Sequence, residues 1–192
     1  MNLVNKSFFF IIALLLLILS SHSLYASDKK AADFNLKNFD GRTITLQDLK
    51  GRVVVLTFSY AFCSARCPII SGRLYALDNL LENYQDVVYL HVSVDPDMDT
   101  AENRRKYFNL YGIDAVKDSR WMFVSGPKDE LSKLWKFYGI NTEKIESKDL
   151  PEGYYINYTQ KVVIIGKSGL IEHNTDFYFA EDKIAKIIRG IK

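Results

Sequence analysis

The chain has 192 residues, of which 48% are hydrophobic and 25% are charged, so it can bury the core of one globular domain. The net charge of +2 is close to zero, and the densest basic group, Arg104 to Lys106, is expected on the solvated face of a helix. With no basic stripe or nucleic-acid-binding motif, the composition argues against nucleic acid as a partner.

The first 26 residues differ in character from the rest of the chain. Lys6 precedes the apolar run FFFIIALLLLIL, Phe8 to Leu19, and the more polar SSHSLYASDKK follows. About a dozen apolar residues match the core of a secretory signal peptide and are short for a membrane span, which needs about 20. We therefore expect residues 1–26 to be a signal peptide or an N-terminal membrane anchor. Residues 27–192 are then expected to form a domain on the extracytoplasmic, periplasmic side, where disulfides persist.

A β-hairpin is predicted for ADFNLKNFDGRTITLQDL, because Asp40-Gly41 forms a turn pair between short alternating runs. The next segment, RVVVLTFSY from Arg52 to Tyr60, is a continuous run rich in β-branched residues. Such a run predicts a strand buried on both faces. This strand leads into Cys63 and Cys67, which are the two cysteines of the chain.

The pattern becomes helical at Pro68. Proline fits only the first turn of a helix, so we expect the helix to begin at Arg66 or Cys67, with Cys63 in the loop before it. Apolar residues then recur at alternating steps of four and three, which is typical of an amphipathic helix. They are Ile70, Leu74, Leu77, Leu81 and Tyr84.

The rest of the chain alternates strands and helices. Strands are predicted for VVYLHVSV, WMFVSG, KVVIIG and GLIEHNT, and helices for PKDELSKLWKFYGI and AEDKIAKIIRGI. Asp99 is expected to cap a further helix reaching about Tyr111, with Glu102 three residues on, and residues 141–157 are expected to be irregular. The alternation implies a mostly parallel central sheet with antiparallel pairing at one edge. A buried strand leading to cysteines at a helix start is the layout of thioredoxin-like proteins.

The cysteine pair straddles the positive end of the predicted helix, where thiolates are stabilised, and Arg66 adds a nearby positive charge. The three-residue gap lets the two thiols close into a disulfide or hold one soft cation between them, and two thiolates suit Cu(I) well. They are too few for a tetrahedral structural zinc site. A purely structural disulfide is the alternative, although so small a loop stabilises a well-packed domain little.

Two motifs carry a family resemblance. TFSYAFCSARCP resembles the Phe-x-Tyr-x-x-Cys-x-x-x-Cys-Pro motif of the Sco/SenC family, and VSVDPDMDT resembles that family's strand ending in Asp-Pro-x-x-Asp-Thr. The resemblance covers about residues 32–190. It implies a thioredoxin-like α/β fold with a mixed central sheet and an N-terminal β-hairpin, in an extracytoplasmic location. It also implies copper binding at Cys63 and Cys67 linked to cytochrome c oxidase assembly, and thiol–disulfide exchange.

The third copper ligand of the family is a histidine, and Tyr158 stands at the matching position of this chain. Asn157 replaces the acidic residue beside it. A neutral phenol with a pKa of about 10 is a poor ligand for soft Cu(I). The resemblance therefore implies a two-thiolate copper site of reduced affinity.

Three other residues could supply the missing ligand. His91 lies inside a predicted central strand and is expected to be packed in the core, whereas His173 is expected on an edge strand away from the thiols. Met98 has a soft thioether but is expected to face solvent. Asp95 and Asp99 are interpreted as a turn residue and a helix cap, with a supporting role near the thiols as the alternative.

These features leave several functions open. The chain is either a copper-handling protein whose client is an oxidase subunit or another thiol protein, or a thiol–disulfide oxidoreductase without copper. In the second case Cys63 attacks and Cys67 resolves, because thiolate reactivity follows exposure. Against a general thioredoxin, Tyr158-Thr159 occupies the usual place of a cis-proline. A non-catalytic binding module that keeps the disulfide is a third possibility, and a peroxidase is disfavoured because its threonine and arginine pattern is not visible.

Overall fold

The structure is a computed structural model that describes residues 29–63 and 67–191, so the expected signal peptide or anchor lies outside the described residues. Seven strands form the central sheet: β1 Asn35–Asn38, β2 Thr43–Thr45, β3 Val53–Ser59, β4 Val87–Ser93, β5 Trp121–Ser125, β8 Val162–Ile165 and β9 Ile171–Thr175. The helices are η2 Gln47–Leu49 (a short 3-10 turn), α2 Cys67–Leu80, α3 Ala101–Asn109, α4 Lys128–Tyr138 and α5 Glu181–Gly190. Two further strands, β6 Thr142–Glu146 and β7 Tyr154–Tyr158, pair only with each other.

The central sheet has the strand order β2-β1-β5-β4-β3-β8-β9. Only β3, β4 and β5 run parallel, while β1 pairs antiparallel with β2 and β5, and β8 pairs antiparallel with β3 and β9. The expectation of a mostly parallel sheet is therefore wrong, and the mixed sheet is confirmed. Hairpins at the two edges of the sheet account for the β1–β2 and β8–β9 pairs. The antiparallel β1–β5 and β3–β8 pairs join strands that are far apart in the chain, so no local turn signal predicts their direction.

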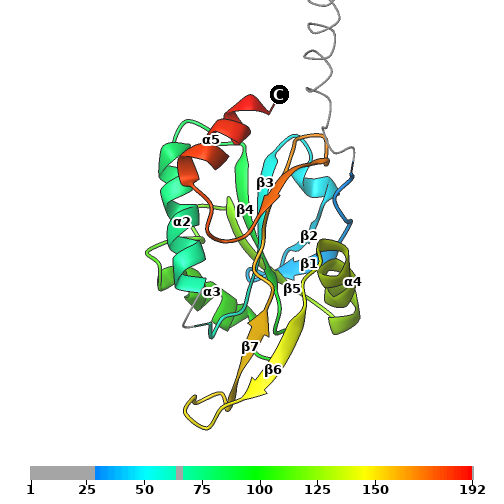
Figure 1. Ribbon diagram of the computed structural model, residues 1–192, viewed down its shortest axis with the longest axis vertical. Coiled ribbons are helices and arrows are strands. Elements are labelled where there is room, and N and C mark those ends of the chain that lie inside the picture. The colour runs from blue at the N-terminus through cyan, green and yellow to red at the C-terminus, as the bar shows by residue number, and fades with distance from the viewer. Residues whose placement is uncertain (1–28, 64–66, 192) are drawn as a thin grey trace, which may run out of the picture.

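The core forms where the apolar patterns predicted it. Every residue of β3 and β4 is buried, and α2 begins at Cys67, as the position of Pro68 predicts. The side chains at the four-and-three spacing of α2, Ile70, Leu74 and Leu77, are completely buried. Figure 1 shows α2 and α5 packed together on one side of the sheet and α4 on the other, so both faces of the sheet are covered.

The segment over residues 141–157 is not irregular, and this prediction is wrong. It forms the β6–β7 hairpin, which extends beyond the end of the main sheet (Figure 1). Along β7, Ile156 and Tyr158 are buried and Tyr155 and Asn157 are exposed, whereas β6 has no buried residue. The polar composition of β6 concealed the hairpin, although the period of two in YYINY is the pattern of a strand with one covered face.

The capping of α3 also differs from the prediction. The helix begins at Ala101, and the Thr100 side chain, not that of Asp99, accepts the hydrogen bond from the Asn103 backbone N–H (3.2 Å). Asp99 is buried, and its two carboxylate oxygens accept hydrogen bonds from the Ala61 backbone N–H and the Ser93 hydroxyl. It is therefore not available to cap the helix. Glu102 pairs with Lys106 on the helix surface and takes no part in a capping box (2.7 Å).

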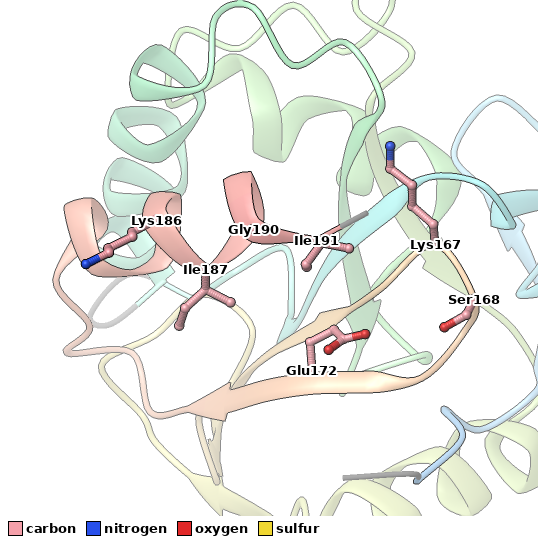
Figure 2. A pocket seen from close by; sticks show the side chains of 7 residues that line it. All are labelled: Lys167, Ser168, Glu172, Lys186, Ile187, Gly190 and Ile191. Atoms are coloured by element: carbon pink, nitrogen blue, oxygen red, sulfur yellow. The ribbon is translucent and has the colours of Figure 1, made fainter. Parts of the chain in front are cut away.

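A hollow of about 600 Å³ lies between the C-terminal end of α5 and the β8–β9 turn. Figure 2 shows that the ammonium groups of Lys167 and Lys186 lie at its opposite sides, so they do not converge on one anion. Lys167 instead forms an ion pair with Asp86 (2.5 Å). Within residues 29–63 and 67–191, no helix combines the length and the apolar character that crossing a bilayer requires.

Candidate functional site

Both cysteines lie where β3 passes into α2. Cys63 is in the loop before the helix and Cys67 is its first residue, and the two sulfurs form a disulfide with a Cα–Cα distance of 5.6 Å. The backbone N–H of Cys67 donates a hydrogen bond to Cys63 Sγ (3.2 Å). The sulfur of Cys63 therefore sits at the positive end of α2, where a thiolate is stabilised once the disulfide is reduced.

Both cysteine residues are buried, but not to the same degree. Cys63 is 7% exposed, whereas Cys67 is completely buried. Phe62 and Ile69, which flank the pair along the chain, are exposed large apolar side chains. Cys63 is thus the less buried member of the pair, and these two apolar side chains lie close to it and to Cys67 in the sequence.

Tyr158 lies against the buried sulfur. Its Oη is 3.1 Å from Cys67 Sγ and donates a hydrogen bond to the Phe58 carbonyl (3.0 Å). The ring packs edge-on against Tyr60, with the ring centroids 6.1 Å apart. Burial raises the pKa of the Tyr158 hydroxyl well above its ordinary value, so the group is a neutral phenol at physiological pH.

Asp99 holds the loop that precedes the cysteines. One carboxylate oxygen accepts a hydrogen bond from the Ala61 backbone N–H (2.7 Å), and the other accepts one from Ser93 Oγ (2.5 Å). Burial raises the pKa of this carboxyl group to about 7. Asp99 thus links the end of β4 to the loop that carries Cys63, and its role as a helix cap is replaced by this one.

Asp95 links the same turn to the β6–β7 hairpin. Its carboxylate accepts a hydrogen bond from the hydroxyl of Tyr154 at the start of β7 (2.9 Å). Burial raises the pKa of Asp95, although the bond from Tyr154 counteracts part of that effect. Sequence patterns missed this contact, because Tyr154 belongs to a segment that was expected to lack structure.

Arg104 holds the turn after β4 by hydrogen bonds, and the expectation that it lies on the solvated face of a helix is wrong. Its side chain is buried, and Nε donates to the Asp99 carbonyl (2.9 Å) while Nη1 donates to the carbonyls of Lys37 (2.7 Å) and Phe123 (2.5 Å). Trp135 Nε1 donates to the Ser93 carbonyl (3.0 Å). These bonds satisfy backbone oxygens that would otherwise be buried without partners.

The other candidate ligands lie elsewhere. His91 is buried among aromatic rings and its Nδ1 is 3.1 Å from Ser59 Oγ, which confirms a packed core histidine, and burial lowers its pKa to about 3. His173 lies on the edge strand β9, with β8 between it and β3, as predicted. Met98 is partly buried in the turn after β4, where solvent exposure was expected. Among the described residues, no three His, Cys, Asp or Glu side chains gather into a metal site.

Curated relatives and solved structures resemble this chain. Protein SCO1 homolog 1, mitochondrial, from Arabidopsis thaliana is 28% identical over 118 residues, and the SCO1 protein homolog of Bacillus subtilis is 30% identical over 95 residues. These matches cover 60% and 48% of this chain. The chain spans only about a third (34%) of the Arabidopsis protein and about half (47%) of the Bacillus protein.

The fold is shared with three solved structures. A SCO1/SenC family lipoprotein from Bacillus anthracis matches with a TM-score of 0.75 and 21% identity, over 88% of this chain and 98% of that one. Arabidopsis thaliana ScoI, solved with copper bound, matches with a TM-score of 0.70 and 22% identity, over 84% and 99%. BsSco, described as having a disulfide switch and as belonging to the Sco family of cytochrome c oxidase assembly proteins, matches with a TM-score of 0.68 and 21% identity, over 85% and 94%.

The SCO1/SenC family model matches residues 23–192, which include the whole described domain and both cysteines. The match includes the strands of the mixed sheet and the disulfide-linked pair at the start of α2. The chain therefore belongs to the SCO1/SenC family.

Proposed function

We propose that the Cys63–Cys67 pair cycles between disulfide and dithiol, and that the dithiol carries Cu(I) during assembly of a cytochrome c oxidase. One observation carries the proposal: the two sulfurs meet at the N-terminus of α2, and Cys63 is the less buried of the two residues (7% exposed against 0%). BsSco and copper-bound Arabidopsis ScoI, which share the fold, support this assignment through their reported disulfide switch and copper.

The redox step consumes one external dithiol. Its thiolate attacks Cys63 Sγ, the Cys63–Cys67 bond breaks, and Cys67 leaves as a thiolate that takes up a proton. The second thiol of the reductant then attacks the mixed disulfide and releases Cys63. Two electrons and two protons are transferred in total, the pair becomes a dithiol, and the reductant becomes a disulfide.

Copper is the cargo in this proposal and not a resident cofactor. Cys63 and Cys67 would bind Cu(I) as thiolates, with both thiol protons released, because soft thiolates prefer Cu(I). The group beside Cys67 is the Tyr158 hydroxyl, a hard oxygen that stays protonated at physiological pH. We therefore expect two-sulfur binding with lower affinity than a site with a third, imidazole ligand provides.

Competition between the reduced protein and a Cu(I)-specific chelator tests the copper role. Wild type is expected to bind one Cu(I) per chain, and Cys63→Ser is expected to lose it, because one thiolate remains. Ser59→Ala, a buried position that is not a sulfur site, is the matched control and should bind as wild type does. Equal binding by wild type and Cys63→Ser would refute copper binding by the pair.

Tyr158→His tests whether position 158 faces the metal. An imidazole in place of the phenol adds a third ligand of a type that copper binds, so this variant is expected to gain Cu(II) affinity by at least about tenfold. The measurement is Cu(II) titration followed by the thiolate-to-copper absorption band. An unchanged affinity would mean that position 158 is not oriented toward the bound ion.

A second function is thiol–disulfide exchange without copper, and the contact between Tyr158 and Cys67 favours it. A phenol against the buried sulfur suits a dithiol–disulfide couple better than a metal site. The discriminating result is a reduced wild-type protein that does not compete for Cu(I) but equilibrates with glutathione. A structural disulfide would instead resist reduction by glutathione.

We also propose an extracytoplasmic location for the domain, residues 27–192, with residues 1–26 as the signal peptide or membrane anchor. The apolar run from Phe8 to Leu19 supports this, and so does the disulfide, which persists in oxidising compartments. The proposed client is a copper-receiving oxidase subunit or another thiol protein. Mass spectrometry of the chain recovered from membrane and soluble fractions will show whether the segment is removed.

A further inference from the structure

The hydroxyl of Tyr158 lies between a sulfur and a backbone carbonyl. Its Oη is 3.1 Å from Cys67 Sγ and 3.0 Å from the Phe58 carbonyl oxygen, and all three residues are buried. The β3–β8 ladder ends at the pair Thr57–Val162, so the Phe58 carbonyl lies just beyond it, and Tyr158 serves as its partner. The hydroxyl therefore connects the redox pair to β3, a fully buried inner strand of the sheet.

The number of hydrogens shared among Cys67 Sγ, Tyr158 Oη and the Phe58 carbonyl oxygen depends on the redox state of the cysteine pair. A phenol carries one hydrogen and accepts others through its oxygen lone pairs. In the disulfide neither sulfur carries a hydrogen, and the Tyr158 hydrogen goes to the Phe58 carbonyl, which is a stronger acceptor than sulfur. The Tyr158 oxygen then receives no hydrogen from Cys67.

Reduction adds the missing hydrogen. When Cys67 becomes a thiol, its S–H can donate to Tyr158 Oη at the 3.1 Å separation already present, while Tyr158 continues to donate to Phe58. Since Cys67 is completely buried, water cannot provide an alternative acceptor for this thiol. The dithiol thus gains one internal hydrogen bond that the disulfide cannot make.

We propose that Tyr158 is a positioning residue that stabilises the reduced form of the pair through the chain Cys67 S–H to Tyr158 Oη–H to the Phe58 carbonyl. This inference rests on the thiol–disulfide exchange proposed above and specifies how the buried sulfur is accommodated after reduction. The two electrons and two protons come from an external dithiol, which becomes a disulfide. The consequence is a more strongly oxidising Cys63–Cys67 disulfide.

Equilibration of the protein with reduced and oxidised glutathione tests the inference. Tyr158→Phe keeps the ring and removes the hydroxyl, so it is expected to shift the equilibrium constant about three- to tenfold toward the disulfide, the effect of one neutral hydrogen bond. The loss of the partner of the Phe58 carbonyl is common to both redox forms and cancels. Tyr138→Phe is the matched control, because the Tyr138 ring packs against Phe58 while its hydroxyl accepts from the Ala32 N–H (3.2 Å), away from sulfur.

The outcomes separate the two proposals. If wild type does not equilibrate with glutathione, both the exchange function and this inference fail. If wild type equilibrates and Tyr158→Phe has the same constant, or Tyr138→Phe shifts it equally, the exchange function stands and the inference is overturned.

A spectroscopic measurement detects the proposed hydrogen bond directly, without the glutathione equilibrium. In Cys63→Ser, Cys67 is the one remaining thiol of the chain, and its Raman S–H stretch is expected at a lower frequency than that of a free thiol, as hydrogen bonding requires. The band should move up when Tyr158→Phe is added. A band at the free-thiol position in Cys63→Ser, or no S–H band at all, would overturn the inference.

Discussion

Asp99 carries a carboxyl group that the fold keeps away from water, and His91 carries an imidazole in the same situation. Burial raises the pKa of Asp99 to about 7 and lowers that of His91 to about 3. Each shift disfavours the charged form, so the two groups make stability depend on pH in opposite directions. His91 lies within β4 and Asp99 lies in the turn after it, and of the two only Asp99 contacts the loop that carries Cys63.

The sign of the Asp99 effect gives a testable prediction. Its folded pKa lies above the unfolded value of 3.8, so its contribution to stability is complete below about pH 4 and is lost as the pH rises through about 7. Asp99→Asn carries no charge at any pH and should escape this loss. As the pH rises from about 4 to about 8, the difference in unfolding free energy between the variant and wild type is expected to change by up to about 4 kcal/mol in favour of the variant.

Urea unfolding across that pH range is the measurement. Asp97→Asn removes an exposed carboxylate from the same turn and is the control, expected to follow the wild-type profile. Burial depresses the folded pKa of His91, so His91 lowers the free energy of unfolding as the pH falls below about 6.5. This acid-side loss of stability is expected to be the same in all three proteins. Parallel profiles for Asp99→Asn and wild type would contradict the role assigned to burial.

At the scale of elements, the β6–β7 hairpin depends on few contacts with the body. It pairs with no strand of the main sheet, and its inward face consists of alternate residues of β7, Tyr154, Ile156 and Tyr158. Tyr154 bonds to Asp95 and Tyr158 contacts Cys67, so both ends of β7 are tied to the cysteine site. The hairpin therefore positions Tyr158 as much as the sheet does.

Removing one of these ties should loosen the hairpin. Tyr154→Phe deletes a hydrogen bond to a carboxylate, which typically contributes about 1.5–3 kcal/mol, so amide exchange in β6 and β7 is expected to accelerate about tenfold or more. Tyr155→Phe alters the outward face of the same strand and should leave exchange unchanged. Hydrogen exchange followed by mass spectrometry compares the two, and equal rates would show that the Asp95 contact does not hold the hairpin.

At the scale of the whole molecule, stability comes from the core and not from the disulfide. Both central strands and the inner face of α2 are buried, and each fully buried aliphatic side chain contributes about 1.5–3 kcal/mol. The loop that the disulfide closes spans a sequence separation of 4. Since loop-closure entropy grows with loop length, this bond constrains the unfolded chain little.

The domain should therefore remain folded when the pair is reduced. Reduction is expected to lower the free energy of unfolding by about 2 kcal/mol, the chain-entropy value for so short a loop. Thermal or urea unfolding of the oxidised protein, the reduced protein and the double variant Cys63→Ser/Cys67→Ser measures this directly. Unfolding of the reduced protein at ambient temperature would assign the disulfide a structural role and oppose the proposed redox cycle.

The sequence by itself determined the elements with strong periodicity and the place of the chemistry. The β-branched run of β3, the four-and-three spacing of α2 and Pro68 were enough to locate Cys63 and Cys67 at a helix start, because each depends on local geometry. Asp40-Gly41 also indicated the β1–β2 hairpin, but no local signal indicated the antiparallel β1–β5 and β3–β8 pairs, which join strands far apart in the chain.

Only the tertiary structure decided which side chains surround the sulfurs. The contacts of Tyr158 with Cys67, of Asp99 with Ala61 and of Asp95 with Tyr154 join residues 38 to 91 positions apart. No local pattern encodes such pairs, since a carboxylate that ends a strand looks the same whether it caps the next helix or accepts from a distant loop. Burial decides between these roles, because an interior donor without an acceptor costs more than an uncapped helix end in water.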